Sequence, residues 1–193
     1  IHFPRKNLKK IDYLKNELNS FPSMKNSDLA SEVSTKYIYK WDNNKKIPIN
    51  FDSIRGKFIA VLDYGIKNNI LKILNQSKYQ IIVFPSNFKI KKILNKNTVG
   101  FFLSNGPGDP KATFEKIKSN LLLIKNTKIP IFGICLGHQI LSLLFGGKTE
   151  KMHHGHRGAN HPIKNHANGK VEITVQNHGF VVSKKKLPKN MKV

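Results

Sequence analysis

The sequence predicts an α/β protein with a doubly wound, mostly parallel sheet, preceded by the end of a smaller domain. From about residue 54 onward, short apolar runs bounded by turn residues alternate with segments of helical periodicity. The runs are continuously apolar, which is typical of parallel strands that helices cover on both faces. At 193 residues the chain is long enough for one such core and part of a second.

The expected elements follow one another in βαβ order. Strands are expected over residues 57–63, 79–85, 99–105 and 128–134. Helices are expected over 67–76, 88–96 and 112–126, with a further helix that follows residue 135 and ends at Gly146-Gly147. In such a sheet the carboxyl ends of the strands share one edge, and open α/β folds bind their ligands there.

The first 53 residues are expected to be a fragment of another domain, plus a linker. Four apolar residues share one helical face at spacings of three and four: Ile11, Leu14, Leu18 and Phe21. That face needs a partner surface. The polar stretch 42–55 contains Pro48 and has little periodicity, which indicates a linker. Residues 54–193 are then expected to form the α/β domain.

The formal net charge of +23 raises nucleic acid and anionic membranes as partners. Lysine supplies nearly all of this charge and is scattered along the chain, whose three arginines are Arg5, Arg55 and Arg157. Because arginine is the residue that reads phosphate and guanine bidentately, we expect no nucleic-acid-binding function. No apolar run reaches the roughly 18 to 20 residues that a membrane span needs, so no membrane partner is expected either.

The cellular compartment is constrained by the single cysteine and by the start of the chain. One cysteine cannot form an internal disulfide, so nothing favours an oxidising compartment. The first residues lack the charged, apolar and small-residue regions of a signal peptide. We therefore expect a cytoplasmic protein.

Reactive chemistry is expected at Cys135. Residues 133–137, Gly-Ile-Cys-Leu-Gly, have the G-x-C-x-G form of a nucleophile elbow, a sharp turn between a strand and a helix. The glycines permit the turn, and a helix N-terminus beneath the thiol favours the thiolate. An isolated cysteine would more often be a small core residue, but the elbow context favours a nucleophile.

A second loop strengthens this interpretation. Residues 106–110, Gly-Pro-Gly-Asp-Pro, directly follow the strand expected over 99–105. Such a loop exposes backbone N–H groups at the ligand-binding edge of the sheet, and acyl transfer needs donors of this kind for the oxyanion of its tetrahedral intermediate. Taken alone, the loop is equally compatible with an ordinary tight turn.

Histidines gather after the elbow helix, and they are His153, His154, His156, His161, His166 and His178. Zinc would need three or four ligands on rigid spacing, whereas most of these histidines lie in a loop-like context without a C-x-x-C or H-E-x-x-H pattern. We therefore expect no metal site. His178 follows an alternating strand pattern over 170–176 and is better placed to line a pocket, although a surface histidine is the plain alternative.

Together these motifs resemble the class I, triad-type glutamine amidotransferases, because residues 133–139 and the loop 105–110 match that family in form and in order. Four further segments are similar to the small subunit of carbamoyl-phosphate synthase, and they span residues 31–41, 62–74, 146–163 and 176–182. The resemblance runs from about Ser31 to about Val182. It implies a flavodoxin-like amidotransferase domain, and it implies that residues 1–53 are the C-terminal remnant of the family's N-terminal domain plus a linker.

The resemblance also implies roles for individual residues. Cys135 is the expected nucleophile, and the backbone N–H groups of Gly106 and Leu136 are the expected oxyanion donors. The expected glutamine-binding residues are Gly106, Gly108, Leu136, Gln139, Asn177, Gly179 and Phe180, with His178 as a possible auxiliary. The implied reaction forms a glutamyl thioester on Cys135 and releases ammonia.

The resemblance further implies that ammonia passes to a large synthetase subunit in a heterodimer. That subunit makes carbamoyl phosphate from bicarbonate and ATP for arginine and pyrimidine biosynthesis, so the expected partners are L-glutamine and the large subunit. No cofactor is expected in this chain, whereas ATP and Mg²⁺ are implied in the large subunit.

One departure from the family concerns the general base. The family places its base and orienting carboxylate in a His-x-Glu element some tens of residues beyond residues 176–180, and no His-x-Glu occurs in this chain. We therefore expect residues 1–193 alone to be inactive, as a piece truncated at both ends. Two other hypotheses are the amidotransferase of another pathway and a non-enzymatic partner that keeps the fold without hydrolysing glutamine.

Overall fold

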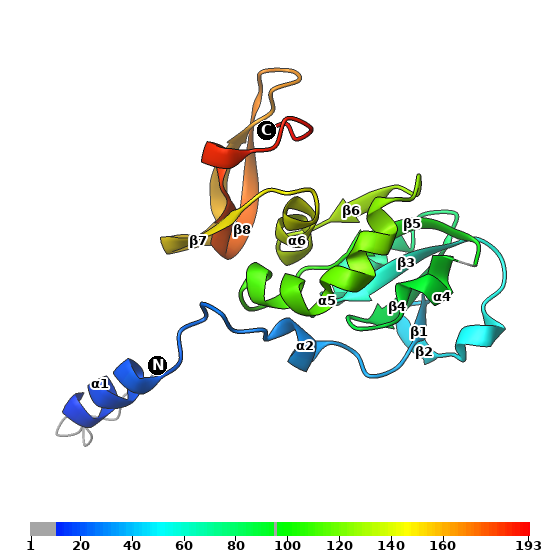
Figure 1. The fold of residues 1–193 in the computed structure, drawn as a ribbon, viewed down its shortest axis with the longest axis horizontal. Helices are drawn as coiled ribbons and strands as arrows, with labels where there is room; N and C mark the ends of the chain where they lie inside the picture. Colours follow the sequence, from blue (N-terminus) through cyan, green and yellow to red (C-terminus); the bar gives the residue numbers. More distant parts are fainter. Residues whose placement is uncertain (1–10, 95) are drawn as a thin grey trace.

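A six-stranded sheet forms the centre of the computed structural model, which describes residues 11–94 and 96–193 (Figure 1). The strands are β1 (Tyr39–Asp42), β2 (Lys45–Pro48), β3 (Phe58–Asp63), β4 (Gln80–Pro85), β5 (Thr98–Leu103) and β6 (Ile131–Gly133). Their spatial order is β2-β1-β4-β3-β5-β6, in which β4, β3, β5 and β6 are parallel and β1 is antiparallel to both of its neighbours. The predicted mostly parallel α/β fold is confirmed.

Helices cover the two faces of this sheet unequally. The α-helices are α1 (Ile11–Ser20), α2 (Ala30–Val33), α3 (Asn68–Leu74), α4 (Ile90–Leu94), α5 (Pro110–Lys125) and α6 (Leu136–Leu144). Helices α4, α5 and α6 pack on one face, where Phe114 and Ile140 meet the strand residues Ala60 and Leu62. Helix α3 covers part of the other face, and beside it an apolar cavity of about 460 Å³ stays open, with Phe132 62% exposed.

Most of the predicted elements lie within a few residues of their expected bounds. Helix α5 begins earlier than expected because Asp109 caps it, accepting a hydrogen bond from the backbone N–H of Lys111 while Pro110 occupies the first turn. None of the described helices is both long and apolar enough to span a membrane.

The linker predicted over 42–55 is wrong for its first half, which completes a hairpin on the main sheet. Tyr39 and Trp41 are 0% and 2% exposed and pack against Val61 and other residues of the α3 face. Asn43 and Asn44, which join β1 to β2, have φ values of 47° and 61°. Two successive residues with positive φ make the tight turn that hairpins favour, and asparagine tolerates that conformation better than most residues.

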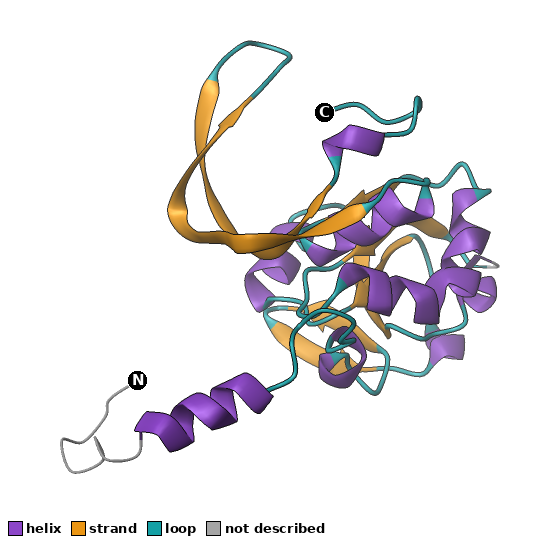
Figure 2. Ribbon diagram, turned by 60° about the vertical axis from the view of Figure 1, so that its left-hand side comes forward, coloured by secondary structure: helices purple, strands orange, loops and turns teal. Residues whose placement is uncertain are grey.

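Helix α1 forms where its periodicity predicted, but none of its side chains is buried. Figures 1 and 2 show it projecting from the body of the molecule. Leu18 is 74% exposed, and Phe21, just after the helix, is 77% exposed. The apolar face of α1 therefore has no partner within the described residues.

A long antiparallel hairpin follows α6 and curves away from the body (Figure 2). It consists of β7 (Thr149–Lys164) and β8 (Val171–Val182). The histidine-rich segment predicted to be loop-like is thus mostly a strand. Cross-strand hydrogen bonding explains the difference, because each half is regular only when paired with the other. Near its base the hairpin returns past α6, where Ser183 donates a backbone hydrogen bond to Lys148 at 2.7 Å.

Candidate active site

Cys135 lies on a strained turn between β6 and α6. Its φ of 52° and ψ of −109° fall outside the regions that L-residues favour. A Cβ atom at Gly137 would collide with the backbone carbonyl of Leu103, and one at Gly133 would collide with the backbone of Gly137. The chain thus forms the sharp strand-to-helix turn that the G-x-C-x-G pattern predicts. Strained backbone conformations of this kind are common at functional sites.

The half-buried thiol of Cys135 is surrounded by groups of opposing effect. Burial raises its pKa, while the backbone N–H of Leu136 and the positive charge of Lys67 act to lower it. The sulfur also lies 3.8 Å from the carbonyl oxygen of Asn177, a contact that suits a thiol and opposes a thiolate. The helix terminus thus acts in the predicted direction through the Leu136 N–H, but burial outweighs it and the thiol pKa is raised overall.

The loop that follows β5 is held rigidly beside the elbow. The side chain of Asn105 accepts a hydrogen bond from the backbone N–H of Lys67 at 3.1 Å and donates one to the carbonyl of Gly65 at 3.0 Å. The carboxylate of Asp109 accepts hydrogen bonds from the backbone N–H groups of Asn26 and Lys111. Among the described residues, the N–H of Gly106 has no acceptor. It is free to donate to a ligand, as an oxyanion donor requires.

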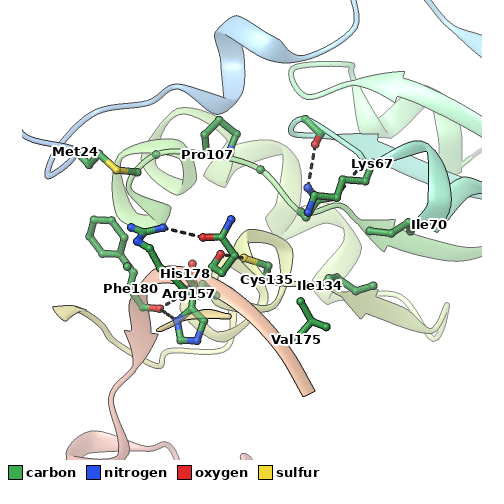
Figure 3. A pocket seen from close by; sticks show the side chains of 17 residues that line it. Met24, Lys67, Ile70, Pro107, Ile134, Cys135, Arg157, Val175, His178 and Phe180 are labelled. Carbon is green, nitrogen blue, oxygen red and sulfur yellow. Dashed lines mark hydrogen bonds between the residues drawn. The ribbon is translucent and has the colours of Figure 1, made fainter. Parts of the chain in front are cut away.

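Strand β8 closes the other side of the site. Gln139 on α6 is buried, and its amide nitrogen donates to the carbonyl oxygen of Phe180 at 2.6 Å. The same oxygen lies 2.9 Å from Nδ1 of His178. On the hairpin, Arg157 Nη1 donates to Oδ1 of Asn177 at 2.7 Å (Figure 3). These contacts hold the Asn177 to Phe180 segment against the elbow helix.

A cavity of about 430 Å³ lies between the loop, the elbow and β8. Eight of the nine residues that the sequence singled out line it: Gly106, Gly108, Cys135, Gln139, Asn177, His178, Gly179 and Phe180. Leu136 is buried, and its backbone N–H acts to lower the pKa of the Cys135 thiol. Residues far apart in the sequence are therefore brought around one thiol.

Two cationic residues of this cavity, Lys67 and Arg157, were missed as site residues. Lys67 could have been found, because it follows the carboxyl end of β3 at the sheet edge that binds ligands. Arg157 could not, because its position depends on the register that pairs it with Asn177 across the hairpin.

The histidines form contacts with one another. Nδ1 of His156 lies 2.8 Å from Oε1 of Gln176 and 3.2 Å from Nε2 of His178, and its ring is 4.7 Å from that of His161. Within the described ranges, no three His, Cys, Asp or Glu side chains are grouped so that they could hold a metal ion. The contacts of His178 run to Gln176, His156 and Phe180.

Comparison with known proteins relates this site to a family. Residues 60–193 match the family model "Glutamine amidotransferase class-I". The chain is 44% identical over 186 residues to the carbamoyl phosphate synthase small chain of Bartonella henselae, covering 94% of this chain and 46% of that protein. It is 43% identical over 196 residues to the small chain of Bartonella quintana, covering 99% and 48% respectively. The chain thus spans about half the length of these curated relatives.

Solved structures support the fold. A protein described as part of a GMP synthase from Thermoplasma acidophilum superposes with a TM-score of 0.56 at 19% identity, over 71% of each chain. A glutamine amidotransferase from Thermotoga maritima gives a TM-score of 0.51 at 15% identity, over 67% of this chain and 64% of that one. With more than half of its length matched by the family model and its elbow, loop and sheet arranged around one thiol, the chain belongs to the class I glutamine amidotransferases.

Proposed function

We propose that this chain is the glutamine-hydrolysing part of a carbamoyl-phosphate synthase small subunit. The observation that carries the proposal is the convergence of the Cys135 elbow, the loop at Gly106 and the segment from Asn177 to Phe180 on one cavity. The similarity to the small chains of two Bartonella species supports a role in carbamoyl phosphate synthesis over a role as the amidotransferase of another pathway.

In the proposed reaction, the sulfur of Cys135 attacks the side-chain carbonyl carbon of L-glutamine. The oxyanion that forms accepts hydrogen bonds from the backbone N–H groups of Gly106 and Leu136. Collapse of this intermediate breaks the carbon–nitrogen bond, and the departing nitrogen takes a proton and leaves as ammonia. Water then attacks the thioester, so glutamate is released and the thiol is restored.

Both steps need a proton carrier. In the family, a His-x-Glu element serves as base and orienting carboxylate, and this chain contains no such element. A second cavity of about 460 Å³ is lined by Cys135, His138 and Met191 among others. A catalytic base supplied by the His-x-Glu element would have room beside the thiol in this cavity. We propose that residues 1–193 alone bind glutamine but do not turn it over at an enzymatic rate.

Ammonia released at Cys135 would pass to a large synthetase subunit, which is the proposed partner in a cytoplasmic heterodimer. That subunit would bind ATP and Mg²⁺ and make carbamoyl phosphate for arginine and pyrimidine synthesis. Residues 1–53 would be the end of a preceding domain, although residues 39–48 contribute the hairpin β1–β2 to the sheet described above.

Replacement of Cys135 by serine tests the proposal in the complete small subunit bound to its large subunit. Glutamine-dependent carbamoyl phosphate synthesis should be lost, while synthesis from added ammonia should stay at the wild-type rate, because ammonia bypasses the thiol. An equal loss of both activities would show that Cys135 has a structural role.

A further inference from the structure

Arg157 is an exposed residue that lines the cavity and contacts a residue of the proposed substrate site. It is the cross-strand partner of Asn177, and its Nη1 donates to the Asn177 side-chain oxygen at 2.7 Å. Its Nη2 lies close to Gly179, where an added Cβ atom would sit 3.7 Å from it. Figure 3 shows the Arg157 guanidinium group on the Met24 and Phe180 side of the cavity, whereas Cys135 lies on the Ile134 side.

This contact settles which way the Asn177 amide is oriented. A guanidinium group carries only donors, so the amide atom that faces it must be the oxygen. The amide nitrogen of Asn177 therefore points elsewhere, and within the described part of the chain it donates to no acceptor. Because Asn177 lines the cavity, its two free N–H groups are available to an acceptor on a ligand.

The charge of the cavity indicates what that acceptor is. Its lining includes Lys67 and Arg157, and no Asp or Glu among the described residues lines it. A ligand group with negative charge is favoured in such a site. Lys67 acts on the thiol of Cys135, whereas the Arg157 guanidinium group lies on the Met24 and Phe180 side of the cavity. An anionic group is therefore favoured at the end of the cavity away from the reacting carbon.

We propose that Arg157 is a positioning residue that makes the site selective for substrates with a free α-carboxylate. It fixes the Asn177 amide through Oδ1, so that Nδ2 donates to the carboxylate while the substrate amide lies at Cys135. This inference rests on the proposed function. It assigns recognition of the α-carboxylate of glutamine to the β7–β8 hairpin.

The test uses covalent labelling of the 193-residue chain at its single cysteine. The probe is the chloromethyl ketone analogue of L-glutamine, whose chloride is displaced as the carbon–sulfur bond forms and the thiol proton leaves to solvent. Its methyl ester and iodoacetamide are the comparison reagents, because they lack the carboxylate. Wild-type chain should show saturable labelling by the acid, with weaker binding of the ester.

Arg157→Ala and Asn177→Ala should each weaken binding of the acid by about tenfold, since a hydrogen bond to a charged group contributes enough for a factor of that size. The preference for the acid over the ester should disappear in both variants, so acid and ester should bind alike. Each labelling rate is divided by the same variant's rate with iodoacetamide, which corrects for any change in thiol reactivity. The double variant should be no worse than Asn177→Ala alone. Arg157→Gln, which keeps an N–H donor for Asn177, should retain most of the selectivity.

Two results would overturn the inference. Additive losses in the double variant would show that Arg157 binds the carboxylate itself, and an unchanged preference for the acid in Arg157→Ala would show that it plays no part. A different result is expected if the proposed function itself is wrong. In that case Cys135 of the wild-type chain would be labelled no more efficiently by the chloromethyl ketone analogue of glutamine than by iodoacetamide. Circular dichroism of each variant checks that it is folded.

Discussion

At the scale of single residues, the reactivity of Cys135 is a balance between burial and two stabilising groups. Burial raises the thiol pKa, whereas the Leu136 N–H and the Lys67 ammonium lower it. A group with a raised pKa is less ionised at neutral pH, so the elbow in this state holds mainly thiol. The alkylation rate should therefore keep rising with pH beyond the ordinary thiol pKa, and only one cysteine contributes to it.

Replacing Lys67 with methionine should raise the pKa of Cys135 further. The change removes the positive charge that lowers this pKa, while the volume of the side chain stays nearly the same. The rate of iodoacetamide labelling at pH 7 should fall severalfold, and its pH profile should move to higher pH. Lys72→Met is the matched control, since Lys72 lies on α3, whose N-cap position Lys67 occupies, but outside the cavity. Equal effects of the two changes would contradict a specific role for Lys67.

At the scale of elements, two hairpins determine features that the βαβ pattern did not predict. The β1–β2 hairpin extends the sheet at one edge, and β7–β8 brings Arg157 and Asn177 to the cavity. Both include segments that look polar and irregular in the sequence, because their regularity comes from pairing with another strand. The asparagine pair between β1 and β2 was the local signal that the linker prediction overlooked.

The buried side of β1 supplies a stability test. Trp41→Ala should lower the free energy of unfolding by about 3 to 5 kcal/mol, because a fully buried aromatic side chain is replaced by a cavity. Ile47→Ala on β2, at a side chain 43% exposed, should cost less than about 1 kcal/mol. Urea unfolding followed by circular dichroism measures both. Similar small losses would show that this hairpin does not share the core.

At the scale of the whole molecule, continuous apolar strands and glycine turns predicted the parallel sheet and the elbow, because these are local patterns. Most residues of the cavity were expected only through the resemblance to the amidotransferases. It did not predict the thiol pKa, which depends on how deeply β8 and its neighbours bury the sulfur. It did not predict the pairing of Arg157 with Asn177 either, because a shift in hairpin register would move the guanidinium group away.

Glutamate release from L-glutamine tests the central claim most directly. The 193-residue chain should be compared with the same chain fused to the remaining C-terminal part of the Bartonella henselae protein, and with the Cys135→Ser form of that fusion, each with its large subunit. The fusion should release glutamate, while its serine form should not. The short chain should be labelled at Cys135 without turnover, because losing the base of a characterised triad costs roughly a millionfold in rate. Full activity in the short chain would place the base among these residues, His178 foremost, and activity in the serine form would show that Cys135 is not the nucleophile.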